Sequence, residues 1–197
     1  LTEVLLSKAA HLLAEVSRRR GTPLRLAFNI SATQLNQHDF VEKTLNDLNA
    51  AGLAPEAFEL ELTESTLMQR VSEAPGILAT LREHGVSISI DDFGTGFSSL
   101  AYLQEINAQT LKIDKRFIND CVYNKASAQL VGSIIAMGHA LGMQLIAEGV
   151  ETAEQLEFIR SLHCEYYQGY LFSKAVSITE FEGLLPSDSR MAAHSPK

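Results

Sequence analysis

Residues 86–92 of the chain read VSISIDD, a run in which valine and isoleucine alternate with serine before two adjacent aspartates. This alternation predicts a β-strand over Val86–Ile90 that buries one face. Asp91 and Asp92 begin DDFGTGFSSL, a loop with two glycines and with serine that can start a helix. The stretch is therefore a strand, a loop and a helix in succession, with two carboxylates at the carboxyl end of the strand.

Five other short apolar runs repeat this arrangement along the chain. Each contains a side chain that can bind a metal or transfer a proton. They are LRLAFN with Asn29, FELELTE with Glu61 and Glu64, LKID with Lys112 and Asp114, MQLIAE with Glu148, and YYQGYLF with Gln168. Strands that alternate with helices predict a parallel sheet. Because the carboxyl ends of all strands in a β/α barrel face one site, we expect one pocket with at least five carboxylates and a lysine.

We therefore predict an α/β fold, a TIM-type β/α barrel in which about six strands are recognisable. A closed barrel of this type needs eight strands, and the chain starts with an amphipathic helix over residues 1–20. The first two strands are expected upstream of Leu1. Without them, the 197-residue chain should have open sheet edges, and it should pair with another copy or aggregate.

Capping residues predict where several helices begin and end. Starts are predicted at Ser31 with Gln34, at Thr152 with Gln155 and at Thr179 with Glu182. Strands are predicted at 24–30, 58–62, 86–90, 111–113, 143–147 and 166–172. Helices are predicted from 31 to near 52, over about 71–84 and over 126–141. One domain should cover residues 1–186, and residues 187–197 should be a flexible polar tail.

The composition is that of one globular domain. The chain has 197 residues, of which 46% are hydrophobic, and a net charge of -8, which argues against non-specific binding of nucleic acid. No apolar run approaches the ~18 residues of a membrane span, and no secretory leader is expected. Cys121 and Cys164 form no metal or redox motif. We expect packing thiols in a reducing compartment, and hence a cytoplasmic location.

The pair Asp91-Asp92 is the strongest local signal for chemistry. Two adjacent carboxylates at a strand end can point to different sides of a loop and hold two different cations. Two cations ~3.5–4 Å apart are the usual arrangement for displacement at phosphorus. The alternative is a solvated turn with an aspartate as a helix cap.

The other candidate residues each have a structural alternative. Glu61 and Glu148 can bind a metal or act as a base, and Glu151 follows closely after Glu148. Lys112 shares a strand face with Asp114 and can neutralise a transferring phosphoryl group, or it can form a structural salt bridge. The remaining candidates can be turn, cap or ordinary strand residues: Asn29, Glu64 and Gln168.

The motifs AFNIS, ELTES, DDFGTGFSSL, LKID, AEGVE and QGYLF, in this order, closely resemble the EAL family of cyclic-di-GMP phosphodiesterases. The resemblance runs from residue 1 to about 185. It implies a modified β/α barrel whose first strand is antiparallel. It also implies hydrolysis of cyclic di-GMP to linear pGpG with two Mg²⁺ or Mn²⁺ ions.

The resemblance also assigns roles to individual residues. Asp91 looks like a ligand shared by the two metals, and Asp92 like a ligand of the second. Glu64 resembles the glutamate that holds the loop after Asp92, which implies a homodimer formed through the Asp92–Leu100 region. Asn29 and Glu61 look like ligands of the first metal, Glu148 like a metal-proximal acid or base, and Lys112 like the residue that orients the attacking water. Asp114 and Gln168 look like supporting residues, and Glu151 is a further candidate for such support.

The chain departs from the family in one respect, since it contains no Glu-Ala-Leu motif. That glutamate is a metal ligand in the family, and we expect it upstream of Leu1, where sensory or cyclase domains can also lie. Because the downstream site residues are intact, truncation is the favoured interpretation, and activity of the isolated chain is expected to be low. A receptor that binds cyclic di-GMP without cleaving it is the main alternative. Enolase-like proton abstraction with Mg²⁺ is a third hypothesis.

Overall fold

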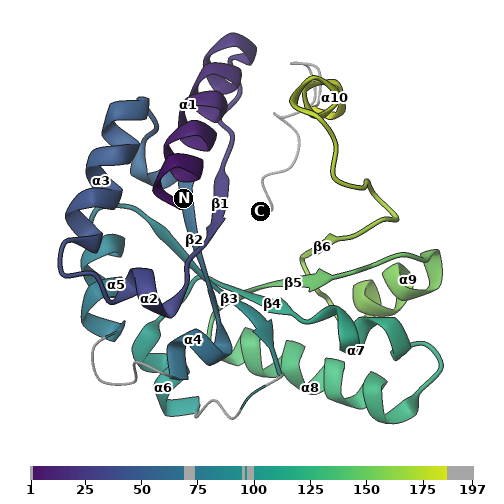
Figure 1. Ribbon diagram of the computed structural model, residues 1–197. Coiled ribbons are helices and arrows are strands. Elements are labelled where there is room, and N and C mark those ends of the chain that lie inside the picture. Colours follow the sequence, from purple (N-terminus) through teal and green to yellow (C-terminus); the bar gives the residue numbers. More distant parts are fainter. Residues whose placement is uncertain (1, 69–73, 95, 97–99, 186–197) are drawn as a thin grey trace.

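The computed structural model describes residues 2–68, 74–94, 96 and 100–185. Its centre is one parallel sheet of six strands whose spatial order follows the chain. The sheet curves into a half-barrel, and within the described residues β1 and β6 form its edges (Figure 1). The six predicted strands are confirmed, with these bounds: β1 (Leu26–Asn29), β2 (Phe58–Thr63), β3 (Ser87–Phe93), β4 (Thr110–Ile113), β5 (Gln144–Glu148) and β6 (Tyr166–Gln168).

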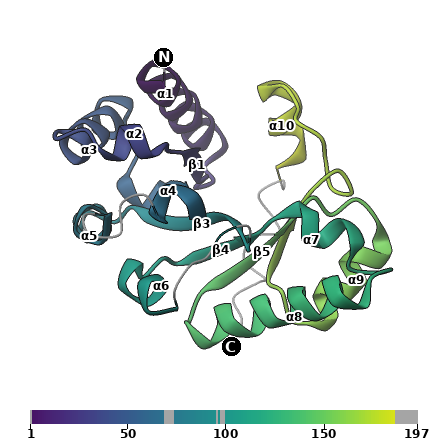
Figure 2. The same cartoon turned by 60° about the horizontal axis from the view of Figure 1, so that its bottom comes forward.

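Helices connect successive strands and cover the outer face of the sheet. Figure 2 shows α6 and α8 on the same side of the sheet, beneath β3, β4 and β5. Each step from strand to strand passes through a helix, as parallel pairing requires. The helices are α1 (Thr2–Arg20), α2 (Ala32–Leu35), α3 (Phe40–Ala51), the 3-10 helix η1 (Pro55–Ala57), α4 (Glu64–Met68), α5 (Ala74–Glu83), α6 (Leu100–Ile106), α7 (Lys115–Asp120), α8 (Lys125–Ala140), α9 (Ala153–Ser161) and α10 (Ile178–Leu184).

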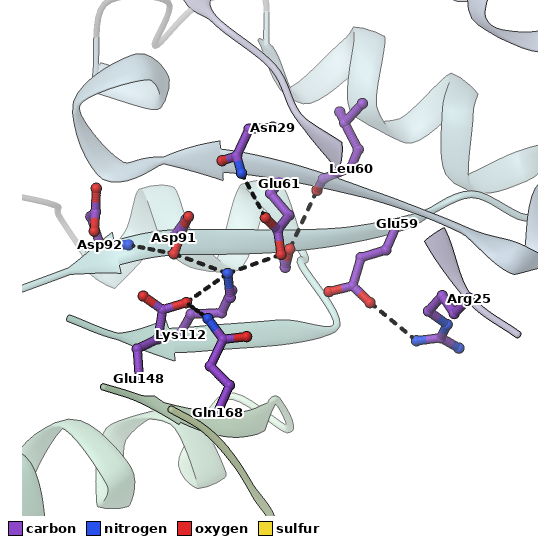
Figure 3. Close-up of polar contacts among 11 residues, drawn as sticks. Arg25, Asn29, Glu59, Leu60, Glu61, Asp91, Asp92, Lys112, Glu148 and Gln168 are labelled. Atoms are coloured by element: carbon purple, nitrogen blue, oxygen red, sulfur yellow. Dashed lines mark hydrogen bonds and ion pairs between the residues drawn. The ribbon is translucent and has the colours of Figure 1, made fainter. Parts of the chain in front are cut away.

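The two faces of the sheet carry different side chains because residues alternate along each strand. Leu60, Ile88 and Leu111 are fully buried in the apolar core beneath the helices. Glu61 and Lys112 alternate with them and lie on the inner face of the half-barrel (Figure 3). The polar residues of the strands are thus directed to one side of the sheet.

The prediction of a single helix from Ser31 to near Gly52 is wrong, because the chain forms two helices there, α2 and α3. Gln34 Oε1 accepts a hydrogen bond from the Ser31 N–H, so the predicted capping box exists, but it starts only the short α2. The polar residues 36–39 then form a turn before α3. Gly52 ends α3 with a left-handed φ of 67°, as predicted.

Two boundaries near the C-terminal end also differ from the prediction. β6 ends at Gln168, not at residue 172, because Gly169 turns the chain against Val150. A Cβ at Gly169 would lie 2.2 Å from the Val150 carbonyl oxygen. The closing helix α10 is capped by Ser177, whose side chain accepts from the Glu180 N–H, rather than by Thr179. Glu182, the predicted capping partner, instead forms an ion pair with Arg19 of α1.

Other predictions fall partly outside the described residues. These include the polar tail over 187–197, residues 71–73 of the predicted helix over 71–84, and part of the Asp92–Leu100 loop. The Thr152–Gln155 capping box of α9 is confirmed by hydrogen bonds in both directions. Of the helices that the structure describes, none has the length and apolar character needed to cross a membrane.

Candidate active site

Six of the predicted site residues meet on the inner face of the half-barrel, near the carboxyl ends of the strands (Figure 3). Parallel register brings neighbouring strand ends level with each other. Asn29 pairs in register with Glu61, and Glu148 pairs with Gln168. The six residues, one from each strand in order, are Asn29, Glu61, Asp91, Lys112, Glu148 and Gln168.

Lys112 lies at the centre of this group. Its Nζ is 2.9 Å from Glu61 Oε1, 3.3 Å from Asp91 Oδ1 and 2.7 Å from Glu148 Oε1, and its side chain is 5% exposed. Burial by itself would lower the pKa of Lys112, but hydrogen bonds and charge attraction from Glu148 and Glu61 outweigh burial and raise this pKa. Lys112 is therefore a charged ammonium that faces carboxylates from three different strands.

Glu148 is held from two sides. Lys112 approaches its Oε1, and Gln168 Nε2 donates a hydrogen bond to the same oxygen at 2.5 Å. Burial raises the pKa of Glu148, and the charges of Asp91 and Glu61 add to the rise, while Lys112 opposes it. A carboxyl group with a raised pKa and a fixed orientation is suited to proton transfer.

Glu61 receives a second donor besides Lys112. Asn29 Nδ2 donates to Glu61 Oε2 at 2.9 Å. This hydrogen bond fixes the amide orientation, with the carbonyl oxygen of Asn29 as the atom left for another ligand. The carboxylate of Glu61 is thereby held between β1 and β4, next to Asp91.

An irregularity in β3 separates the two adjacent aspartates. The register with β4 shifts between Ile90 and Phe93, and Asp92 has a φ of 52°, which is uncommon for a residue with a side chain. Asp91 is buried, whereas Asp92 is exposed, and the Asp92 N–H donates to Asp91 Oδ1 at 2.9 Å. The two carboxylates therefore occupy different environments although they are neighbours in the chain.

Three carboxylates converge closely enough to hold a metal ion. One oxygen each from Asp91, Asp92 and Glu148 lie within 4.8 Å of one another. Burial raises the pKa of Asp92, and the negative charges of Asp91 and Asp114 add to the rise. Such carboxylates repel one another unless a cation lies among them, and their oxygens are the ligands that hard divalent cations prefer. The residues present therefore fit a hard divalent cation.

Glu64 connects this site to the loop after Asp92. Glu64 is almost fully buried at the start of α4. Its Oε2 accepts the backbone N–H of Gly94 at 3.1 Å and that of Gly96 at 3.0 Å. Glu64 therefore contacts the loop after Asp92, which is the contact that the resemblance implies. The two contacts that the structure describes are with Gly94 and Gly96.

Asp114 lies beside the cluster, and its side chain is held by the first turn of α7. The Arg116 N–H donates to its Oδ1 at 2.7 Å, and the Arg116 guanidinium donates to its Oδ2. Burial would raise the pKa of Asp114, but these hydrogen bonds outweigh burial and lower it. Asp114 therefore acts as the cap of α7 at the border of the site.

Glu151 lies beyond the end of β5, outside the strand that carries Glu148. It is exposed after β5, and its backbone N–H donates to Gln155 Oε1 at 2.8 Å. The turn at Gly149, with a φ of 68°, separates it from the strand end that carries Glu148. Glu148 and Glu151 thus differ in exposure although they lie three positions apart in the sequence.

Two charged pairs near the site were not predicted. Glu59 is buried on the inner face and pairs with Arg25 at 3.3 Å, and Arg116 pairs with Asp114. The alternation of Glu59 and Glu61 was a signal for the first pair. The sequence contains no local signal for which cation Glu59 would meet.

Comparison with models of known protein families identifies the family of this chain. The family model described as EAL domain matches residues 1–175. The chain belongs to the EAL domain family. Cyclic di-GMP phosphodiesterase NbdA of Pseudomonas aeruginosa is 44% identical over 162 residues, which are 82% of this chain and 21% of NbdA. The chain thus spans about one fifth of the length of the curated relatives it matches.

Solved structures agree with this EAL assignment. The PaMucR phosphodiesterase in its c-di-GMP complex gives a TM-score of 0.87 at 37% identity, over 91% of this chain and 72% of that one. Klebsiella pneumoniae BlrP1, in a manganese/cy-diGMP complex at pH 6, gives a TM-score of 0.77 at 29% identity, over 85% and 42%. The half-barrel of this EAL domain matches these neighbours, which confirms the predicted fold class.

Proposed function

We propose that this EAL domain is a metal-dependent phosphodiesterase that hydrolyses cyclic di-GMP to linear pGpG. The observation that carries the proposal is the buried Lys112 ammonium, which lies 2.7–3.3 Å from carboxylates of Glu61, Asp91 and Glu148. The names of NbdA and PaMucR support cyclic di-GMP as the substrate. Membership of the EAL domain family also argues against the enolase-like alternative.

The donor set supports two divalent cations, Mg²⁺ or Mn²⁺. Asn29, Glu61 and Asp91 would hold the first, and Asp91, Asp92 and Glu148 would hold the second. When bound, these cations supply the positive charge that lets a phosphodiester approach the carboxylates and be activated there. BlrP1, which was solved with manganese and cy-diGMP, supports the choice of metal.

The protein side chains have separate tasks in this proposal. When Glu61 and Asp91 hold cations, Lys112 Nζ would be released to donate to a water or to a phosphoryl oxygen and place it next to Glu148. Lys112 and Gln168 hold Oε1 of Glu148, so Glu148 accepts or returns a proton at its other oxygen, Oε2. Asn29 keeps the Glu61 carboxylate in place.

The proposal is tested on the domain with the segment expected upstream of Leu1 included, by measuring pGpG release from cyclic di-GMP by chromatography with Mg²⁺, Mn²⁺, Ca²⁺ or a chelator. Hydrolysis is expected with Mg²⁺ and Mn²⁺ only. Ca²⁺ should inhibit, because its longer and looser coordination misplaces the attacking water. Undiminished hydrolysis in chelator would rule out the metal-dependent mechanism.

The same assay separates the enzyme from the receptor alternative. A receptor would bind cyclic di-GMP in calorimetry with Mn²⁺ and would release no pGpG over hours. An enzyme that lacks a required cation would also bind without turnover, so each metal is assayed at several concentrations. Turnover that appears at any of these concentrations excludes the receptor.

We also propose a homodimer, further domains and a cytoplasmic location for this protein. The contact of Glu64 with Gly94 and Gly96 supports a homodimer through the Asp92–Leu100 loop region, which would couple assembly to the site. The longer relatives support sensory or cyclase domains elsewhere in the protein. The free, buried thiols of Cys121 and Cys164 support a reducing, cytoplasmic compartment.

A further inference from the structure

Arg116 is a fixed cation that the proposed reaction does not yet use. Its Nε and one terminal nitrogen donate to Asp114 Oδ2 at 3.0 and 2.9 Å. The Asp114 side chain is 6% exposed, whereas the Arg116 side chain is 64% exposed. The buried carboxylate therefore orients one edge of the guanidinium, and the rest of the group remains accessible.

The fold places Arg116 on the Asp92 side of the site. Phe93 of β3 pairs in register with Ile113 of β4, and Asp114 follows Ile113 directly, so Asp114 and Arg116 lie at the same end of the sheet as Asp92. The guanidinium is bound to the Asp114 carboxylate, so Arg116 is fixed at the strand ends that carry the site.

The first turn of α7 is also packed rigidly against the loop after Asp92. Phe117, the residue after Arg116, lies so close to Gly94 that a Cβ there would be 2.7 Å from Phe117 Cε2. The backbone N–H of Arg116 donates a hydrogen bond to Asp114 Oδ1. Both the backbone and the guanidinium of Arg116 are thus held in place, which reduces the entropy lost when a ligand binds.

We propose that Arg116 binds a phosphoryl oxygen of the substrate on the Asp92 side, with Asp114 as the positioning residue. A guanidinium offers five N–H donors in a planar fork, and Asp114 takes two of them. The fork matches phosphate oxygens, and an anionic substrate that approaches a chain of net charge -8 gains from a cation outside the carboxylate cluster. This inference rests on the proposed function and names a residue that sets its affinity for the anionic substrate.

The test compares Arg116→Gln, Arg116→Lys and the matched control Arg160→Gln in steady-state hydrolysis of cyclic di-GMP with Mn²⁺. Arg160 is an exposed arginine on α9. Arg116→Gln should raise KM by about 10-fold with kcat within about 2-fold, because a charge-assisted hydrogen bond to bound substrate is lost. Arg116→Lys should raise KM by about 3-fold, since the charge remains but the fork is lost. Arg160→Gln should leave both constants unchanged.

Salt provides a second readout that a purely structural role would not change. The wild-type KM should rise more steeply with ionic strength than the KM of Arg116→Gln. An unchanged KM in Arg116→Gln, with only a lower melting temperature, would overturn the inference and leave Arg116 as a partner for Asp114. If Arg116→Gln does not fold, an unchanged KM in Arg116→Lys overturns it equally. Wild-type protein that neither hydrolyses nor binds cyclic di-GMP would instead overturn the proposed function and this inference together.

Discussion

Two acidic regions on the inner face of the half-barrel have different electrostatic surroundings. Near the start of β2, Glu59 pairs with Arg25, whose side chain is 53% exposed. Two residues further along the same strand, Glu61 pairs with Lys112, which is buried with two more carboxylates around it. Both glutamates are 7% exposed, so burial alone does not distinguish the two regions.

The number of carboxylates around each cation is what differs. Arg25 faces Glu59, and the pair is electrically balanced. Lys112 faces three carboxylates, and Asp92 lies nearby, so negative charge is in excess at the carboxyl ends of the strands. Excess buried charge is costly unless a ligand cation offsets it. The comparison indicates that the carboxyl end of this sheet is built for binding and the opposite end for stability, as is general in β/α barrels.

The largest expected effect is that of Lys112→Met. Turnover should fall by at least ~10²-fold, because the donor at the centre of the site is lost. Arg25→Met, the matched change at the balanced pair, should leave turnover within about 2-fold. Rates of pGpG release at saturating cyclic di-GMP and Mn²⁺ measure both. Near-normal turnover in Lys112→Met, with only weaker substrate binding, would contradict the role given to Lys112.

Glu148→Gln should lower turnover by about 10²-fold, since the amide cannot accept the proton that the carboxylate takes. Glu59→Gln is the control within the other region and should have little effect on turnover. Calorimetry with cyclic di-GMP should show that Glu148→Gln still binds the substrate. If both glutamates can be replaced without loss of rate, the distinction between the two regions is wrong.

Gln168→Ala should have a smaller effect, a fall in turnover of about 10-fold. Its side chain orients Glu148 through one hydrogen bond and does not replace the carboxylate. Gln168→Glu should be worse than Gln168→Ala, because it places another negative charge against Glu148. Equal rates for the two variants would show that the hydrogen bond does not hold Glu148 during the reaction.

The smallest effect concerns stability at the balanced pair. Arg25→Met should lower the free energy of unfolding by about 1 kcal/mol, because Glu59 loses its partner while the exposure of Arg25 weakens their attraction. Urea unfolding at pH 7 measures the change. The double variant Arg25→Met with Glu59→Leu should recover much of the loss. No recovery would mean that Arg25 stabilises the protein by packing rather than by charge.

Much of the candidate site followed from strand ends alone. Asn29, Asp91 and Glu148 were predicted because each ends an apolar run, and parallel strands align their carboxyl ends. Glu151 was also proposed, yet the Gly149 turn leaves it exposed. The pairing of Glu59 with Arg25 was not predictable, since no pattern in one strand states which neighbour stands opposite.

The sequence by itself determined the six strands, their parallel arrangement and the residue types at their ends, because alternation, capping and strand-end chemistry are local properties. The tertiary structure alone decided that Lys112 lies among three carboxylates and that a register shift gives Asp91 and Asp92 different environments. It also decided that Asp114 is buried, whereas its partner Arg116 remains exposed. Distances between side chains of different strands depend on the register and curvature of the whole sheet. Register and curvature are set by interactions along the entire chain, so no single segment of the sequence determines them.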